Sequence, residues 1–318
     1  MLSLILPVYR NEESIPQLVS VLVELNHQLD GALEAVIVDD GSPDKSREIL
    51  QRLLPDARVT SKLVVLSRNF GSFAAIRAGL EAGQGDRFAV MAADLQEPPE
   101  LVLKFDALLR SGQCDVVVGS RSGRSDPLFS RLTARLFWGV YRMIAQREVP
   151  RGGVDVFGCN RQFRDEILAL HERNSTLVGL VFWLGFRREE VLYVRRPREH
   201  GVSAWSFSRK ARYLLDSSFA FSDLPIRLLS LTGLSGMTLS VVLALTVLVA
   251  KAAGSVRVPG YTATVLTVMF FGGLNALGIG LLGEYVWRTF ENTKGRPNFV
   301  VASQFAYGKD DESARSER

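Results

Sequence analysis

The segment Ala35-Val36-Ile37-Val38-Asp39-Asp40-Gly41-Ser42 joins an apolar run to two acidic residues and a turn. Apolar residues in a row, without polar alternation, are typical of a parallel strand that helices cover on both faces. Gly41 permits a sharp turn, and Ser42 favours the start of a helix. The segment therefore predicts a buried strand that ends in two carboxylates, although Asp-Gly-Ser is also common in ordinary strand-to-helix turns.

Similar apolar runs occur on both sides of this segment. The predicted strands are Leu2–Leu6, Ala35–Val38, Leu63–Leu66, Phe88–Met91 and Asp115–Val118. Helical patterns occupy 13–29, 43–54, 72–83 and 98–111, whereas the glycine-rich stretch 150–160 indicates a loop. Alternation of strands and helices predicts a doubly wound, Rossmann-like α/β sheet. Such sheets bind ligands beyond the carboxyl ends of their strands, so functional residues are expected there.

The composition changes after residue 227. The 318-residue chain combines a positive mean hydropathy of +0.11 with 23% charged residues, so its apolar residues are concentrated. Leu228–Ala250 and Val258–Gly283 hold 23 and 26 residues without a charge, and each is long enough for a hydrocarbon core of about 30 Å. The pattern predicts transmembrane helices at 227–251 and 261–287, joined by a short external loop, 252–260. The alternative is a buried helical hairpin.

Residues 204–226 precede the first predicted span and place aromatic residues opposite basic ones, which indicates an amphipathic helix in the headgroup layer. An ordinary surface helix is the alternative. Two spans return the chain to its starting side, so domain 1–203 and tail 288–318 share a compartment. The basic residues near the spans favour the cytoplasm. The first apolar run is too short for a signal peptide.

The segment Asp94-Leu95-Gln96 follows the fourth predicted strand. A carboxylate and an amide oxygen two residues apart are suitable ligands for a divalent cation that bridges the protein and a diphosphate. The alternative is an acidic turn without metal. The net charge of +4 suits acidic partners, but the basic residues are scattered and no aromatic platform accompanies them. A nucleic-acid binder is therefore not expected.

Taken together, these segments resemble the family 2 glycosyltransferases with a GT-A fold, in the branch of dolichol-phosphate mannose synthase and the bactoprenol glucosyltransferases. The resemblance covers nearly the whole chain. Its segments are Pro7-Val8-Tyr9, Val38–Ser42, Ser67-Arg68-Asn69-Phe70-Gly71, Asp94–Glu100, Gly119-Ser120-Arg121, Gly283-Glu284-Tyr285 and Lys294-Gly295-Arg296-Pro297. The last two, after two spans, indicate the bacterial branch, and hence a multi-pass protein of the bacterial inner membrane.

The resemblance implies a role for each matched residue. The donor nucleotide sugar, UDP- or GDP-linked, would contact Pro7, Tyr9, Asp39, Asp40, Arg68, Asn69 and Gln96. Mg²⁺ or Mn²⁺ would bind Asp94 and Gln96, and Asp155 would orient the acceptor or act as a base beside Asp94. The phosphate of the polyprenyl acceptor, such as undecaprenyl phosphate, would contact Arg121, Arg131, Arg135, Arg209 and Lys210. A solvated face is the alternative for the arginines.

The sequence departs from the family pattern at three places. Ala92 stands where an aspartate usually begins Asp-x-Asp, Arg10-Asn11 replaces Asn-Glu, and Ala204 replaces a lysine. We expect an enzyme that transfers a sugar with inversion for cell-envelope glycan or lipid modification. A processive polysaccharide synthase is less suitable, because no Gln-x-x-Arg-Trp segment is present. The other alternative is a catalytically silent membrane partner. Small residues in the spans would permit a homo-oligomer.

Overall fold

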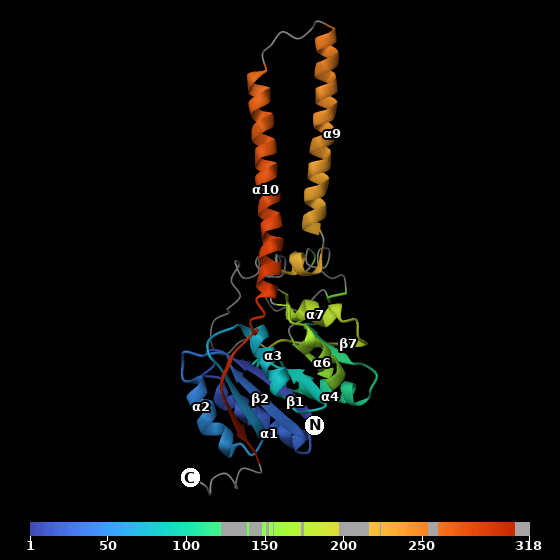
Figure 1. Cartoon of the computed structure of the whole chain (residues 1–318). Coiled ribbons are helices and arrows are strands. Elements are labelled where there is room, and N and C mark those ends of the chain that lie inside the picture. Colours follow the sequence, from blue (N-terminus) through green and yellow to red (C-terminus); the bar gives the residue numbers. More distant parts are fainter. Residues whose placement is uncertain are drawn as a thin grey trace.

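The protein is described from a computed structural model, which covers residues 1–121, 139, 148–150, 153–154, 156–172, 175–196, 216–222, 224–253 and 260–308 (Figure 1). Its strands are β1 (Leu2–Val8), β2 (Leu33–Asp39), β3 (Thr60–Leu66), β4 (Arg87–Val90), β5 (Val116–Arg121), β6 (Val156–Asn160), β7 (Arg188–Tyr193) and β8 (Val301–Tyr307). Its helices are α1 (Ile15–Gln28), α2 (Ser46–Leu53), α3 (Ser72–Ala82), α4 (Glu100–Arg110), α6 (Arg161–Ala169), α7 (Leu177–Trp183), α9 (Leu224–Ala252) and α10 (Tyr261–Thr293), with a 3-10 turn at Leu54–Asp56.

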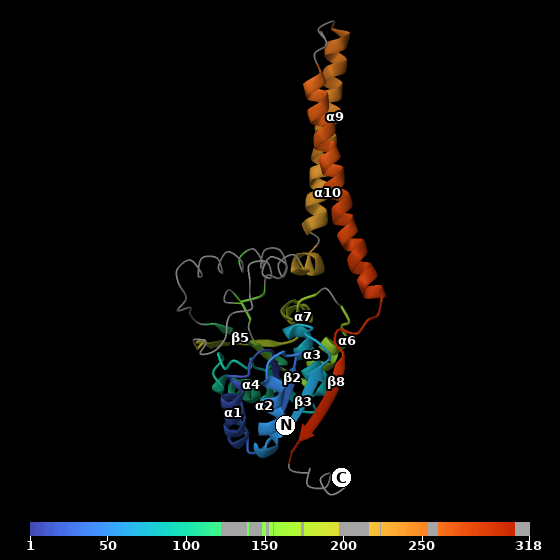
Figure 2. The same ribbon diagram turned by 90° about the vertical axis from the view of Figure 1, so that its left-hand side faces the viewer.

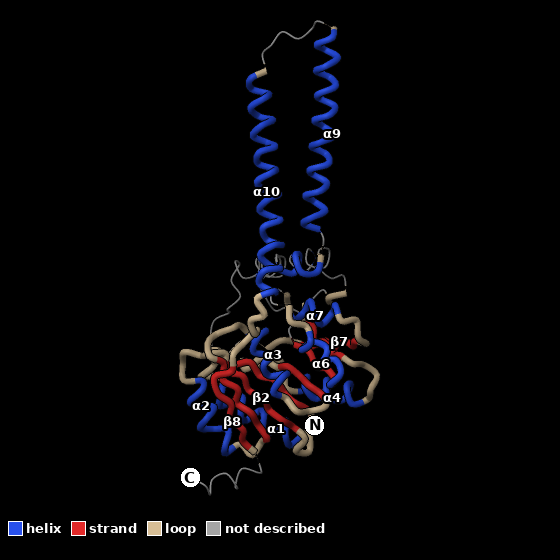
Figure 3. The backbone as a smooth tube through the Cα atoms, viewed as in Figure 1, coloured by secondary structure: helices blue, strands red, loops and turns tan. Residues whose placement is uncertain are grey.

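The strands form one eight-stranded sheet in the order β7-β5-β6-β4-β1-β2-β3-β8. Its centre, β4-β1-β2-β3, is parallel, and β2 is buried along its whole length. Side chains of β1 alternate between two cores: Leu4 and Leu6 pack with α1 and α4, whereas Ile5 packs with α3. Helices therefore cover both faces (Figure 3), which confirms the predicted α/β class.

Strand β6 occupies Val156–Asn160 of the stretch 150–160, for which a loop was predicted; that prediction was wrong for this second half, whereas the described residues 150, 153 and 154 have no regular secondary structure. β6 is antiparallel to both β4 and β5, so the sheet is mixed. Gly158 lies in the middle of this strand, and a Cβ there would lie 3.0 Å from the Phe88 carbonyl oxygen and 3.1 Å from the Phe105 ring. The glycine thus serves close packing against the core and does not mark a turn.

Helices α9 and α10 extend side by side away from the sheet (Figure 1). Gly236 of α9 faces Phe271 of α10, and Gly278 of α10 faces Leu229. In the described part of the chain, no helix combines the length and the apolar character that a bilayer crossing requires. The transmembrane spans expected at 227–251 and 261–287 are thus unconfirmed and stay predictions.

The C-terminal end of α10 contacts the sheet domain through a helical turn at residues 216–221. Arg288 contacts Asp216 at 2.8 Å, and the ring of Phe219 meets that of Tyr285 edge-on, with centroids 5.3 Å apart. Phe221 packs against α7, where a Cβ on Gly179 would lie 2.2 Å from its ring. Ionic and aromatic contacts thus connect the helix pair to α7.

Strand β8 returns the chain from α10 to the sheet, within the segment 288–318 that was expected to be a tail. It runs antiparallel to β3, with Val301 opposite Leu66 and Tyr307 opposite Ser61 (Figure 2). The amide of Ser67 donates to the carbonyl of Val300 at 2.9 Å. Because β8 runs from the helix pair toward the start of β3, the carboxyl edge of the parallel strands faces the C-terminal end of α10, at Thr293.

Arg77 on α3 fixes the position of α6. Its guanidinium is buried and donates to three carbonyl oxygens at the end of that helix, those of Ile167, Leu168 and Leu170, at 2.9, 3.1 and 2.7 Å. These carbonyls belong to the last turn of a helix, where no intrahelical donor remains.

We predict that Arg77→Met lowers the free energy of unfolding by about 2–4 kcal/mol, because three carbonyls at the end of α6, that of Ile167 buried, lose a charged donor while the apolar stem is kept. Urea unfolding of the full chain in detergent, followed by tryptophan fluorescence, measures the change. The matched control, Arg52→Met, alters an exposed arginine of α2 and should change stability by less than about 0.5 kcal/mol. Equal effects of the two substitutions would contradict a capping role for Arg77.

Candidate functional site

The predicted site residues of the first four strands lie at one edge of the sheet. Strands β1 to β4 are parallel, and each is followed by a loop at its carboxyl end. Strand β5 has the same direction, because β6 is antiparallel to both β4 and β5. This edge holds Pro7, Tyr9, Asp39, Asp40, Arg68, Asn69, Asp94, Gln96 and Arg121. The structure therefore brings these residues to one edge, and the roles that the resemblance implies for them stay predictions.

The loops after β1 and β2 hold each other through reciprocal hydrogen bonds. The amide of Arg10, which has a φ of 57°, donates to Ser42 Oγ, and the amide of Asn11 donates to Ser46 Oγ. The amide of Glu12 donates to Asp44, and its carboxylate accepts from the amide of Lys45 at 2.9 Å. The sequence does not indicate these hydrogen bonds between the two loops, because the bonded residues are more than thirty positions apart.

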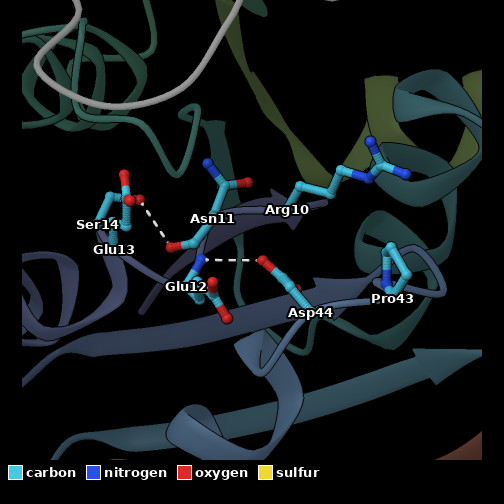
Figure 4. A pocket seen from close by; sticks show the side chains of 7 residues that line it. All are labelled: Arg10, Asn11, Glu12, Glu13, Ser14, Pro43 and Asp44. Atoms are coloured by element: carbon cyan, nitrogen blue, oxygen red, sulfur yellow. Dashed lines mark hydrogen bonds between the residues drawn. The ribbon is translucent and has the colours of Figure 1, made fainter.

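A pocket of about 420 Å³ opens between these loops, lined by Arg10, Asn11, Glu12, Glu13, Ser14, Pro43 and Asp44. Figure 4 shows Pro43 and Asp44 on the loop after β2, facing the residues of the loop after β1. The Arg10 guanidinium lies 5.4 Å from the centre of the exposed Tyr9 ring. The pocket is thus lined by a cation, carboxylates and an amide, which can form hydrogen bonds with a polar ligand, and the exposed Tyr9 ring lies next to its Arg10.

Asp40 organises the loop after β3. Its buried carboxylate accepts hydrogen bonds from the amides of Phe70 at 2.7 Å and Gly71 at 2.9 Å. Burial raises the pKa of Asp40 above its ordinary value, although the two amide donors act in the opposite direction. Gly41 permits the contact, because it has a φ of 62° and a Cβ there would lie 2.5 Å from the Arg68 backbone. Asp40 therefore holds residues 68–71 in place from the buried side of the loop.

Asp39 and Arg68 differ in their access to a ligand. The carboxylate of Asp39 is buried and accepts from the amide of Ser42 at 3.0 Å, which shapes the turn into α2. Arg68 is exposed, and its guanidinium stacks 4.1 Å from the centre of the Phe70 ring. Arg68 and Asn69 thus present polar groups at the surface of the edge, while the aspartates below them hold the loops.

The loop after β4 is a compact turn connected to its neighbours. The side chain of Ser14 donates to the carbonyl of Ala93 at 3.0 Å, which joins this loop to the one after β1. Leu95 has a φ of 54°, and the buried carboxylate of Glu97 accepts from the amide of Ala92 at 3.3 Å. Asp94 is half-buried and accepts from the amide of Gln96 at 3.4 Å.

Gln96 is engaged by a residue that sequence analysis did not single out. Arg195, just beyond β7, donates from its guanidinium to the side-chain oxygen of Gln96 at 2.6 Å. Among the described residues, no group of three or more His, Cys, Asp or Glu side chains suits a metal ion. With Ala92 in the first motif position and the Gln96 oxygen already bonded, these residues as arranged do not form a complete metal site. The Mg²⁺ or Mn²⁺ expected at Asp94 and Gln96 stays a prediction.

The predicted acceptor residues are only partly described. Arg121 ends β5, half-buried, in register with Tyr193 of β7. Asp155, Arg131, Arg135, Arg209 and Lys210 lie outside the residues that the structure describes. Of the described residues nearest to Asp155, Val156 begins β6 and pairs with Gly119 near the carboxyl end of β5.

Comparison with known proteins covers nearly the whole chain. An uncharacterised glycosyltransferase of Synechocystis is 32% identical over 95% of this chain and 94% of its own length. An undecaprenyl-phosphate 4-deoxy-4-formamido-L-arabinose transferase of Pseudomonas syringae is 35% identical over 94% of this chain and 89% of its own. A bactoprenol glucosyl transferase of Shigella phage SfX is 30% identical over 95% and 99%, respectively.

The family is identified by its sequence model. The model for glycosyl transferase family 2 matches residues 3–170, which include β1 to β6 and the loops at the carboxyl edge. The mixed α/β sheet with its parallel centre agrees with the GT-A fold that the resemblance implies. The chain belongs to glycosyl transferase family 2 and is a glycosyltransferase.

Proposed function

We propose that the protein transfers a sugar from a UDP- or GDP-linked donor to a polyprenyl phosphate such as undecaprenyl phosphate. The names of two relatives support the lipid acceptor, since one is an undecaprenyl-phosphate transferase and another a bactoprenol glucosyl transferase. Both alignments span at least 94% of this chain and so include α9 and α10.

The observation that carries the proposal is the position of the site relative to the helix pair. β8 connects the C-terminal end of α10 to the carboxyl edge of β3. The loops proposed to bind the donor therefore face the ends of α9 and α10 that lie nearest the sheet. These helices expose many large apolar side chains, among them Leu231, Leu245, Val249, Phe270, Leu277 and Ile279. Exposed apolar side chains in this number favour lipid as the surrounding medium. A lipid-borne acceptor would then meet the donor at this edge.

Sugar transfer to a lipid phosphate depends more on groups that position and neutralise charge than on a strong base. A lipid phosphate is anionic at neutral pH, so its oxygen can attack the anomeric carbon directly while the bond to the donor diphosphate breaks. A single displacement inverts the anomeric centre and releases the nucleoside diphosphate. The pocket between the loops after β1 and β2 would hold the nucleoside, and Arg121 at the end of β5 would pair with the acceptor phosphate.

We also propose a location for the protein. We place the sheet domain at the cytoplasmic face of the bacterial inner membrane, with α9 and α10 in the bilayer and a role in cell-envelope glycan or lipid modification. The juxtamembrane segment 204–226 would lie at the lipid surface, and Phe219 and Phe221 in its described part already tie α10 to α7. Homo-oligomer formation stays a prediction.

Transfer of radiolabelled sugar to undecaprenyl phosphate tests the proposal. Purified full-length protein is expected to transfer label from one member of a panel of UDP- and GDP-sugars. Arms with Mg²⁺, with Mn²⁺ and with chelator test the predicted cation, and Asp94→Ala should lower the rate by about tenfold or more. The same protein with dolichol in place of the phosphorylated lipid should show no transfer.

A catalytically silent partner would instead bind the nucleotide without transfer, and the departure from the usual cation site at Ala92 and the engaged Gln96 is the observation that favours it. Absence of transfer from every donor, by protein that still binds one of the nucleotides, would reject the proposed reaction and favour that alternative.

We predict that Asp40→Asn raises the KM for the donor by about tenfold, because an amide can accept from only one of the two backbone donors in residues 70–71 and presents its own NH₂ to the other. The value of kcat should change less, since Asp40 is buried beneath the loop. Asp86→Asn, at the opposite edge of the sheet, is the control. Initial rates over a range of donor concentrations measure both constants, and a pure kcat effect would contradict a loop-positioning role.

Membrane insertion is tested separately. After expression in bacteria, the full chain should stay in the membrane fraction through alkaline carbonate washing and require detergent for release, because α9 and α10 expose large apolar side chains that lipid would cover. Release by carbonate alone would reject the proposed spans without affecting the assignment to the family.

A further inference from the structure

Two consecutive arginines after β7 contact the loop after β4 in different ways. Arg195 donates from Nη2 to the side-chain oxygen of Gln96 at 2.6 Å, and its Nε lies 3.7 Å from Glu97. Arg196 uses its backbone, whose amide donates to the Gln96 carbonyl at 2.9 Å and whose carbonyl accepts from Gln96 Nε2 at 3.3 Å. The side chain of Arg196 turns instead to the exposed Glu100, at 3.7 Å.

These contacts engage both polar groups of the Gln96 amide. The side chain is buried, and its oxygen holds a short, charge-assisted hydrogen bond. A divalent cation coordinated by the same oxygen would lie about 2 Å from it. It would therefore also lie close to the positively charged guanidinium of Arg195. A cation and Arg195 thus compete for one oxygen, although an amide oxygen has two lone pairs.

The charges around the oxygen favour the guanidinium. Ala92 lacks the carboxylate that would help to attract a metal, while Glu97, buried in the same loop, lies within 3.7 Å of Arg195. Arg195 Nε is buried and has no hydrogen-bond partner among the described residues, so the side chain is held mainly through Gln96 and the charge of Glu97.

We propose that Arg195 is a positioning residue that holds the Gln96 oxygen in the donor-free enzyme and keeps it from a divalent cation. Gln96 becomes available to a cation only after Arg195 has been released from it. The inference rests on the proposed function in so far as that function places a cation at Asp94 and Gln96. It implies that the free enzyme binds metal weakly and that removal of Arg195 strengthens binding.

The test is a titration of purified full-length protein with Mn²⁺ alone, in which free Mn²⁺ is measured by electron paramagnetic resonance. Arg195→Met is expected to lower the Kd for Mn²⁺ by about tenfold, the equivalent of one charge-assisted hydrogen bond. Arg195→Gln is the second variant if the methionine variant does not fold, as judged by thermal melting.

Two matched variants separate the hydrogen bond from general charge. Arg196→Met removes the neighbouring guanidinium, which does not contact the Gln96 side chain in the described structure, and should leave the Kd unchanged. In a Gln96→Ala background, Arg195→Met should no longer strengthen binding, because the contested oxygen is absent. This double-mutant cycle isolates the pairwise effect.

Three results would overturn the inference. They are weaker or unchanged Mn²⁺ binding in Arg195→Met, an equal gain in Arg196→Met, and an equal gain in the Gln96→Ala background. Because the titration needs neither donor nor acceptor, its outcome is independent of the transfer assay. Transfer activity with an unchanged Kd in Arg195→Met would reject this inference alone, whereas a tighter Kd without transfer from any donor would reject the proposed reaction alone.

Discussion

The buried carboxylate of Asp40 is the contact on which the arrangement of the site depends. It lies at the end of β2 and receives two backbone amides from the loop after β3, while its own amide is bonded to the carbonyl of Val8 in β1. One residue thus connects the ends of three neighbouring strands. Burial raises the pKa of Asp40, because removal from water disfavours the charged carboxylate, and the two backbone donors act in the opposite direction.

The remaining loops extend this connection across the sheet edge. Ser14 links the loop after β1 to the loop after β4. Arg195 links the loop after β4 to the segment that follows β7. A ligand at the edge therefore meets a surface whose parts are held by hydrogen bonds between segments distant in sequence. Such preorganisation reduces the ordering that binding would otherwise require.

The sequence predicts the central strands well, because continuous apolar runs followed by polar turns have few other interpretations. It fails at β6, where Gly158 resembles a loop residue although it serves packing against Phe105. It also fails at β8, whose partly exposed edge-strand pattern carries little hydrophobic signal. In the site, residue types indicate which side chains gather at the edge. They do not show that Asp40 faces backbone amides or that Gln96 faces Arg195, since both depend on tertiary contacts between distant segments.

The pairing of β8 with β3 has a consequence for the order in which the protein is made. Strands β1 to β4 leave the ribosome early, but the outer side of β3 stays unpaired until residues 301–307 have been synthesised. An open strand edge is a site for wrong pairing with other chains, and closing a loop of more than two hundred residues is slow. The sheet is therefore completed only after both long helices exist, so their placement precedes the closure of the domain that carries the site.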